Sequence, residues 1–389
     1  MANLSNLSRD LVEDILYRVP MTSMRAVRCT CKKWNTLSKN ETFTKKHLAQ
    51  AAAEAEREGE FLAIVTMNCS LHLMSLNLHG THDNGFDPCI RTRGKLINLD
   101  DSDQVVVSRV CHCEGLLLCT TEAYSWLAVW NPYSGQTRWV SVEPTSVHHR
   151  KLWYSHALGY EKENGGKSYK ILRFAYLDSK RSVHEIYELK SNSWRVLDVT
   201  PDWEIDYDNH GVSLNGNTYW FATDKESRGV FPDFLLCFDF TKERFVVPRL
   251  PLPFRSYYKD AVTLSSVREE QLAVLFQHSN TFEIEIWVTT KIEPGEVSWS
   301  KFFAVEMGPL TGFRFYTGGS FLVDEEKRAV VVFDQDKNVE KPTRNVAYMI
   351  GENGYLREVD LGKITTGREG FPHARSYVPS SVLINQTSA

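Results

Sequence analysis

Apolar residues recur at helical spacing near the start of the chain and at alternating positions over most of the rest. A first helix is predicted between Ser8, a suitable N-cap, and Pro20, which ends the apolar run. Its apolar side chains fall on one side: Leu11, Ile15, Leu16 and Val19. Apolar spacing continues to a break at Asn40, with Thr22 or Ser23 as the next cap. The pattern predicts a compact bundle of three small helices, which must bury its apolar side against something else.

The pattern changes after this helical start. A last helical stretch begins near Phe43 and continues into a run rich in Ala, Glu and Arg, which are strong helix formers. Gly59 then marks a boundary, and from Phe61 onward short strands are separated by turn residues. The sequence predicts a helical domain over residues 1–48, a helical linker over residues 49–60 and a β domain over residues 61–389.

A strand–turn–strand unit recurs through the predicted β domain. The clearest copy runs from Trp130, through a turn of Asn, Pro, Ser and Gly, to Trp139. Four further copies follow, spaced by about 50 residues: residues 186–194, 237–245, 285–299 and 347–359. Residues 61–78 are interpreted as a degenerate first copy. Each unit is predicted to form an outer hairpin of a repeated sheet.

Very apolar segments lie between these hairpins, at residues 115–119, 271–276 and 328–333. They suit burial on both faces and are predicted to be the inner strands of each unit. Repeats of about 40 to 60 residues with about four strands each are typical of a β-propeller. Counting gives about six blades, with a last apolar strand over residues 377–384 that pairs into the first blade and closes the ring. The predicted fold class is therefore a small helical domain followed by an all-β propeller.

Composition and charge narrow the partners. The chain has 389 residues and a net charge of -4, so no basic field favours nucleic acid. No stretch reaches about 18 consecutive apolar residues, and the start lacks a secretory signal, so we expect no membrane partner and a cytoplasmic or nuclear location. The eight cysteines are spread along the chain, which favours reduced thiols over disulfides.

No segment carries the pattern of a catalytic or metal site. Cys29 and Cys31, like Cys111 and Cys113, are separated by one residue instead of the two that zinc sites usually have, so buried structural cysteines are the preferred interpretation. Histidines lack an evident carboxylate or nucleophile partner: His148, His149, His156 and His210. Nucleophile elbows, phosphate-binding loops and dinucleotide fingerprints are absent from the sequence. We expect no catalysis, no cofactor and no bound metal.

The helical start resembles the F-box, the module that anchors substrate receptors to Skp-type adaptors in SCF ubiquitin ligases. The matching residues keep the family's order and spacing: Leu7, Asp10, Leu11, Ile15, Leu16, Arg18, Pro20, Val27, Arg28, Cys31, Lys32, Trp34, Phe43 and Leu48. One position departs from the family, because its usual Leu-Pro pair is here Leu7-Ser8. The resemblance implies that the loss of this rigid entry weakens adaptor binding.

The rest of the chain resembles the type-1 F-box-associated domain, a kelch-like propeller common in plant F-box proteins. The resemblance is carried, in sequence order, by these segments: 113–118, 131–132, 159–160, 169–171, 216–220, 250–254, 286–288 and 377–381. It implies capture of a protein substrate by the propeller, with substrate-contacting loops as candidates at residues 124–126, 202–209 and 225–232. The substrate itself has no signature in the sequence.

The main hypothesis is a non-catalytic substrate receptor that docks on a Skp-type adaptor and, through it, on a cullin-RING ligase. An apolar patch would be covered by the adaptor, in an interface of roughly 1,600 Å², and its candidate residues are Leu7, Leu11, Ile15, Leu16, Pro20, Met24, Val27 and Trp34. Some of these, including Ile15, Leu16 and Trp34, also close a small internal core. The alternatives are a propeller lectin, a ligand-binding propeller or propeller enzyme, and an F-box protein that acts outside any ligase.

Overall fold

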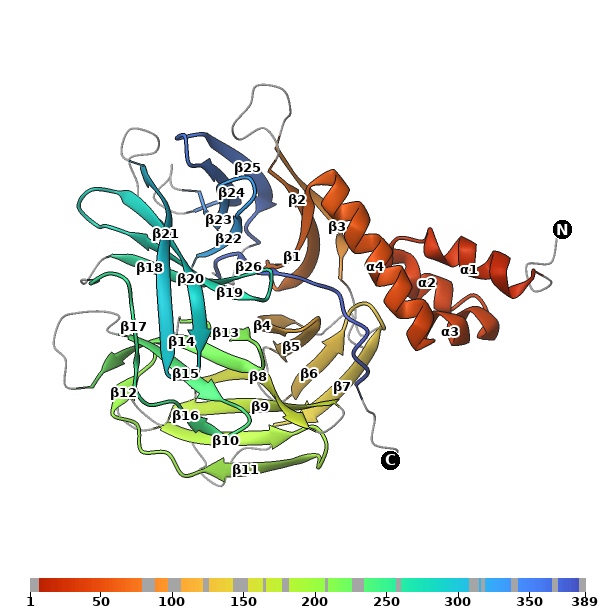
Figure 1. Cartoon of the computed structure of the whole chain (residues 1–389), viewed down its shortest axis with the longest axis horizontal. Coiled ribbons are helices and arrows are strands. Elements are labelled where there is room, and N and C mark those ends of the chain that lie inside the picture. The colour runs from red at the N-terminus through yellow and green to blue at the C-terminus, as the bar shows by residue number, and fades with distance from the viewer. Residues whose placement is uncertain are drawn as a thin grey trace.

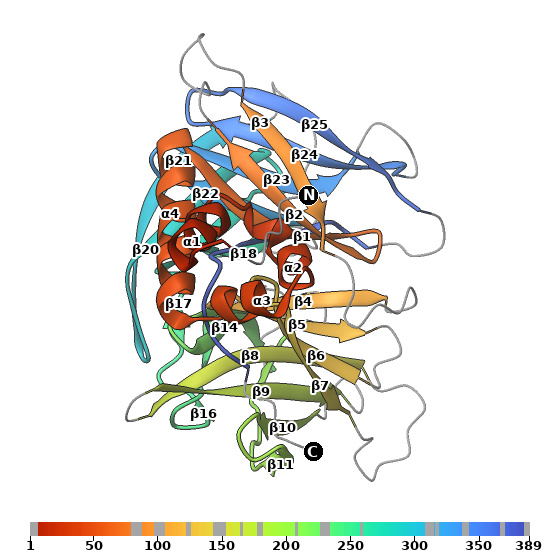
Figure 2. The same ribbon diagram turned by 90° about the vertical axis from the view of Figure 1, so that its right-hand side faces the viewer.

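The computed structural model consists of a small helical head beside a ring of β-sheets (Figure 1). It describes residues 7–78, 88–96, 106–121, 126–142, 153–163, 166–176, 182–206, 209–225, 234–256, 260–307, 315, 319–336, 342–365 and 370–384. Within these ranges the sheets form six blades, which confirms the predicted helical domain followed by a propeller. The head is attached at one side of the ring and not over its axis (Figures 1 and 2).

The head contains four α-helices and one 3-10 turn, at the bounds α1 Arg9–Tyr17, η2 Met21–Ser23, α2 Met24–Arg28, α3 Lys32–Ser38 and α4 Glu41–Glu58. Ser8 caps α1 as predicted, with its Oγ accepting from the Leu11 amide at 3.4 Å. Asn40 caps α4 by accepting from the amides of Thr42 and Phe43 at 3.0 and 3.2 Å. Helix α4 continues without a break through the predicted linker and ends at Gly59, whose φ of 62° gives it a left-handed C-cap.

The six blades are built mainly from consecutive antiparallel strands. Blade 1 contains, from the centre outward, β26 His373–Ser376, β1 Glu60–Met67, β2 Ser70–Asn77 and β3 Cys89–Lys95. Blade 2 contains β4 Val107–Cys113, β5 Leu116–Thr121, β6 Trp126–Asn131 and β7 Gln136–Ser141. Blade 3 contains β8 Trp153–Glu163, β9 Gly166–Tyr176, β10 Ser182–Glu188 and β11 Ser193–Leu197.

The remaining three blades follow the same order. Blade 4 contains β13 Val212–Leu214, β14 Asn217–Asp224, β15 Phe234–Asp239 and β16 Arg244–Phe245, with β12 Trp203–Glu204 paired to β14 and β17 Leu250–Pro251 paired to β15. Blade 5 contains β18 Ala261–Val267, β19 Gln271–Gln277, β20 Glu283–Glu293 and β21 Glu296–Glu306. Blade 6 contains β22 Ser320–Asp324, β23 Ala329–Gln335, β24 Arg344–Gly351 and β25 Leu356–Lys363.

The five recurring hairpins are confirmed as the outer strand pairs of blades 2 to 6. Residues 61–78 are a different part of the blade, since they form β1 and β2, the middle pair of blade 1. The most apolar segments lie in β5, β19 and β23, which are second from the centre and not innermost. A second strand is flanked within its sheet by strands on both sides and covered on both faces by neighbouring blades, so it is the most uniformly apolar strand.

The ring closes as predicted, but with a different segment. The closing strand is β26, whose four residues pair with β1 through partners such as Ala374 and Val65. Residues 377–384, which were expected to be that strand, form none; they cross instead to blade 2. There the Asn131 side chain donates to the carbonyls of Ser380 and Val382 at 3.1 and 2.8 Å. The prediction was wrong because β26 reads His-Ala-Arg-Ser and lacks an apolar pattern, whereas the following segment is more apolar.

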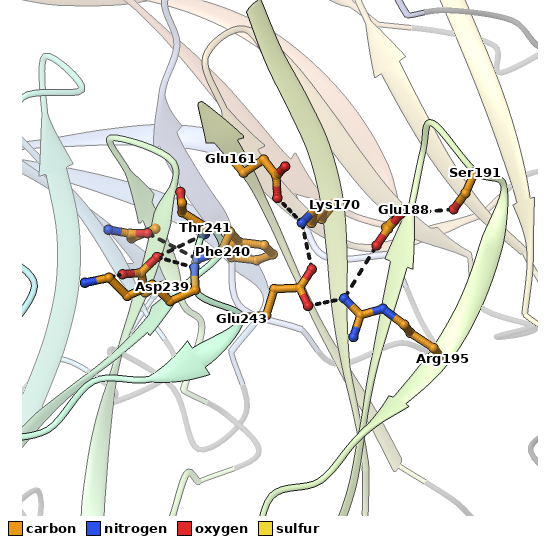
Figure 3. Close-up of polar contacts among 11 residues, drawn as sticks. Glu161, Lys170, Glu188, Ser191, Arg195, Asp239, Phe240, Thr241 and Glu243 are labelled. Carbon is orange, nitrogen blue, oxygen red and sulfur yellow. Dashed lines mark hydrogen bonds and ion pairs between the residues drawn. The ribbon is translucent and has the colours of Figure 1, made fainter. Parts of the chain in front are cut away.

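Adjacent blades are also joined by charged side chains, as Figure 3 shows for blades 3 and 4. Lys170 on β9 binds both Glu161 and Glu243, and Arg195 on β11 binds Glu243 and Glu188. Burial alone would raise the pKa of Glu243, but hydrogen bonds from Lys170 and Arg195 lower it below its ordinary value. The network therefore holds the β15–β16 turn of blade 4 against β9 and β11 of blade 3.

Three histidines near the ring's centre are kept neutral by their surroundings. His112 on β4 and His156 on β8 are buried, and His373 begins β26. Burial, followed by nearby guanidinium charges, lowers the pKa of each imidazole to about 3. In an unfolded chain the same groups titrate near pH 6.5. The unfolded state therefore binds more protons below that pH, and acid favours unfolding.

We expect the free energy of unfolding to fall by at least about 2 kcal/mol between pH 6.5 and pH 5.5. The stability contributed by each depressed imidazole is complete above pH 6.5 and is lost as the pH falls toward 3. Glu269 acts in the opposite direction, because burial raises its pKa to about 7 and the folded state takes up a proton there as the pH falls. Urea unfolding at the two pH values measures the difference. A free energy that stays constant or rises at pH 5.5 would contradict the neutral state of the histidines.

Candidate adaptor-binding surface

Helix α1 carries apolar side chains on two sides. Val12 and Leu16 are fully buried in the head, where they pack with Met24, Leu37 and Phe43. Leu11 and Ile15, four residues apart and therefore adjacent on the helix surface, are instead 53% and 40% exposed. One side of α1 thus closes the core of the head, and the other presents leucine and isoleucine to solvent.

The eight candidate residues separate into three groups. Leu11, Ile15 and Pro20 are exposed. Partly buried side chains packed against the head core form the second group: Leu7, Val27 and Trp34. Leu16 and Met24 are 0% exposed and pack inside the head, so in this structure they have no surface to offer a partner. They hold α1 and α2 together. The surface that a partner can reach is formed by the other six candidate residues.

The entry to α1 is fixed without the proline that the family usually has there. Ser8 supplies a side-chain cap, and the carbonyl of Leu7 accepts a hydrogen bond from Lys33 Nζ at 2.8 Å. Lys33 belongs to α3, so this bond ties the start of α1 to another helix of the head. These contacts supply part of the restriction that a proline ring would give.

The head is attached to the propeller through a buried arginine. Arg28, at the end of α2, is only 9% exposed and donates from Nη1 to the carbonyl of Tyr133 at 2.5 Å. Its Nε and Nη2 donate to Oγ and to the carbonyl of Ser38 at 3.2 and 3.4 Å. The guanidinium carbon also lies 5.3 Å from the centroid of the Tyr133 ring. Because Tyr133 lies in the β6–β7 turn, Arg28 connects α2 and α3 to blade 2.

A stack of aromatic rings continues from the head into the propeller. Tyr17, Phe43, His47 and Tyr133 follow one another with centroid separations of 4.8, 5.7 and 5.8 Å. His47 Nε2 lies 2.9 Å from the carbonyl of Val19, to which it donates, so its Nδ1 accepts from the Tyr133 hydroxyl at 3.1 Å. Burial lowers the pKa of His47, which favours this neutral tautomer.

A cavity of about 290 Å³ lies beside this junction. It is bordered by the head through Arg28, Ser38 and Thr44 and by the propeller side through Tyr133 and Leu383. Sequence reasoning did not identify the junction. Arg28 appeared only as a matching position of the helical module, and nothing in the local pattern links it to a tyrosine 105 residues later.

We expect Tyr133→Ala to loosen the head from the propeller. The change removes the ring beside Arg28 and the hydroxyl that donates to His47. Each of these two contacts stabilises the junction by about 1 kcal/mol. Amide hydrogen exchange in α2 and α3 should accelerate by about tenfold or more, while the strands of blades 4 to 6 keep their protection. Tyr187→Ala, which removes a buried tyrosine away from the head, is the matched control. Equal acceleration in both variants would contradict a specific role of Tyr133.

The structure also bears on the predictions about metal sites, cysteines and membrane spans. In the described ranges no group of three or more His, Cys, Asp or Glu side chains is arranged to hold a metal. All eight cysteines are free; Cys29 and Cys31 are exposed, which corrects their interpretation as buried residues, and the Cys31 Sγ accepts from the Trp34 amide at 3.4 Å. Among the described helices, none has the length and apolar content needed to cross a bilayer.

The three loops named as substrate-contacting candidates lie largely outside the described residues, as do His148 and His149. Of the loops, only Trp126, residues 202–206, Asn209 and Lys225 are described. Trp126 begins β6 and is 48% exposed, so it is one large apolar side chain that these loops present to solvent.

Comparison with known proteins identifies both parts of the chain. Residues 4–46 match the F-box domain family, and residues 62–384 match the family described as F-box associated beta propeller domain. An Arabidopsis thaliana relative, At3g17620, is 55% identical and covers 98% of this chain and 96% of its own. The F-box/kelch-repeat protein At3g16740 and the F-box protein At3g17320 of the same plant are 51% and 49% identical, each covering 99% of this chain and 100% of its own. The chain therefore belongs to the F-box proteins that carry an F-box associated β-propeller domain.

Proposed function

We propose that this chain is a non-catalytic substrate receptor of an SCF-type ubiquitin ligase. The F-box head would dock on a Skp-type adaptor and through it on a cullin-RING assembly, and the propeller would capture a protein substrate. The observation that carries the proposal is the solvent-exposed pair Leu11 and Ile15, on a helix whose opposite side is already buried. Apolar side chains of this size in a folded module are typical of a surface covered by a partner.

The rigid head–propeller junction supports the same proposal. Arg28, His47 and Tyr133 hold the head in one orientation against blade 2. A receptor fixed in this way would keep a bound substrate at a constant position relative to the ligase. The effective concentration of the substrate's lysines near the ubiquitin-loading machinery would rise accordingly. We place this activity in the cytoplasm or the nucleus.

The test is reconstitution in two stages. The full chain is co-expressed with a Skp-type adaptor, and complex formation is measured by pull-down and gel filtration. The complex is then combined with the cullin-RING components, and ubiquitin transfer to the receptor or to captured proteins is measured. No complex with a Skp-type adaptor would remove the basis of the proposal and favour a lectin or another ligand-binding propeller. A stable complex without any ubiquitin transfer would favour an F-box protein that acts outside a ligase.

A further inference from the structure

Four basic side chains gather where the innermost strands meet, and we call them the channel cluster: Arg109, His210, His373 and Arg375. Arg109 on β4 lies five residues before the turn at Glu114, and His210 lies five residues before the corresponding turn at Asn215. Innermost strands of a propeller run in the same direction, so these two residues lie at the same depth in the ring. Blades 2 and 4 thus place a guanidinium and an imidazole at one level.

His210 and His373 meet across the axis of the ring. Their ring centroids are 3.9 Å apart with an interplanar angle of 62°, although His373 begins the innermost strand of blade 1 and His210 precedes that of blade 4. Blades 1 and 4 are opposite each other in a ring of six (Figure 1). Arg375 follows His373 by two residues and therefore extends from the same side of β26. The two imidazoles are therefore in direct contact at the centre of the ring.

Arg375 is a buried cation without a counter-charge. It is 9% exposed, and its one hydrogen bond runs from Nη1 to the carbonyl of Ala374 at 3.5 Å, the outer limit of such a bond. No carboxylate of the described residues forms an ion pair with it. Two other buried guanidinium groups of the ring have closer partners: Arg173 is paired with Glu185 at 2.6 Å, and Arg138 donates to the Asn192 Oδ1 at 3.1 Å. Arg28 of the head is equally buried, but it makes three hydrogen bonds to neutral groups. A buried charge with so few partners is destabilising, and Arg375 is therefore suited to bind a ligand.

One neighbouring group has unused hydrogen-bonding capacity. Nδ1 of His373 is enclosed and has no hydrogen-bond partner. His210, His373 and Arg109 are each partly exposed. Burial, followed by the charges of Arg375 and Arg109, lowers the pKa of His373 to about 3. Both effects keep the His373 imidazole neutral.

The opposite end of the ring has the reverse polarity. The turns that end the innermost strands of blades 2, 4 and 5 border a hollow of about 220 Å³, to which Glu114, Glu269 and Glu270 contribute carboxylates and Arg268 a cation. A negatively charged ligand would be repelled from this acidic mouth. The channel cluster therefore offers its positive charge toward the end at which the innermost strands begin.

We propose that the channel cluster is a binding site for a small oxyanion of the phosphate type, either inorganic phosphate or a phosphate monoester. The guanidinium group of Arg375 supplies charge and forked N–H donors, which match tetrahedral oxyanions well, and Arg109 adds positive charge. The imidazoles of His210 and His373 supply further donors and limit the size of the group. This site goes beyond the proposed receptor function and does not depend on it.

The test uses thermal unfolding of the full chain, exchanged into chloride buffer and titrated with inorganic phosphate at constant ionic strength. The melting temperature of the wild type is expected to rise as phosphate is added. The phosphate concentration that gives half of this rise should be at least tenfold higher for Arg375→Gln. Arg91→Gln, whose arginine is exposed on β3, is the matched control and should behave like the wild type. In chloride alone, Arg375→Gln should be at least as stable as the wild type, because it removes an unpaired buried charge. Phosphate also stabilises proteins non-specifically, so the comparison among the three chains carries the result.

Each outcome either supports or overturns the site. If phosphate stabilised the wild type and Arg375→Gln equally, the proposed site would be overturned. It would also be overturned if citrate stabilised the wild type and phosphate did not. Native mass spectrometry of the exchanged protein detects an anion that remained bound during purification; no added mass and no phosphate response would also overturn the proposal. Glycerol 3-phosphate, titrated in parallel, distinguishes the two sources: a midpoint below that of inorganic phosphate assigns the site to esters, and the reverse assigns it to the free ion.

Discussion

Replacing Leu11 and Ile15 together with aspartate is expected to abolish the complex with a Skp-type adaptor while the chain stays folded. Both side chains are largely exposed, so the head loses little packing when they change. In a complex the new carboxylates would be buried against an apolar surface without partners, at a cost of several kcal/mol. Since about 1.4 kcal/mol corresponds to a tenfold change in affinity, we expect binding to fall by at least about a hundredfold.

The control for this experiment lies on the same helix. Arg9→Glu changes the charge of α1 by as much as the double substitution does, but Arg9 is 68% exposed and lies on another side of the helix. Its ion pair with Glu13 is exposed and contributes little to stability. Complex formation is measured by titration calorimetry, with circular dichroism as the check on folding. Equal loss of binding in both variants would indicate a general charge effect and contradict the proposed surface, as would full binding by the double variant.

Truncation after Gly370 is expected to abolish cooperative folding of the propeller. The deleted segment contains β26, the innermost strand of blade 1, and leaves an edge of β1 unpaired at the centre of the ring. It also contains Ala374 and Tyr377, which are 0% and 4% exposed. Because the net stability of a domain is only about 5–15 kcal/mol, the loss of one strand and its contacts is enough to unfold it. The truncated chain should give a broad, non-cooperative melting curve.

Two shorter truncations identify which part of the segment matters. A chain ending at Ile384 keeps every described contact of the C-terminal segment and should melt like the full chain. A chain ending at Val378 keeps β26 but loses the two hydrogen bonds that Asn131 donates to the carbonyls of Ser380 and Val382. We expect an intermediate destabilisation of about 2 kcal/mol or more, because Asn131 is 0% exposed and its amide would have no partner. If truncation after Gly370 left the melting temperature unchanged, closure through β26 would be refuted.

The hairpins were predictable because their information is local. In the copy at residues 130–139, one side chain fixes the turn: the Asn131 Oδ1 accepts from the amides of Tyr133 and Ser134 at 2.9 and 3.1 Å. Asp239 does the same for Thr241 and Lys242 in blade 4. Alternation of apolar residues and turn chemistry act within a few residues, so they can be read from the sequence.

The proposed adaptor-binding surface was only partly predictable. Helical spacing identified Leu11, Ile15, Leu16 and Met24 as apolar positions of one small module, but it did not divide them into exposed and buried sides. That division depends on where the neighbouring helices pack, which periodicity alone does not contain. The tertiary structure buries Leu16 and Met24 and leaves Leu11 and Ile15 to solvent.

The sequence by itself determined the two-part organisation, the helix cap at Ser8, the break at Asn40, the five outer hairpins and the approximate number of blades. Only the tertiary structure decided which segment closes the ring, how Arg28 and Tyr133 attach the head, and that Arg109, His210, His373 and Arg375 meet in the channel. The physical reason is the range of the interactions. Caps, turns and strand periodicity are set by residues close in sequence, whereas ring closure and the channel bring together residues 100 to 300 positions apart, whose proximity depends on the packing of all six blades.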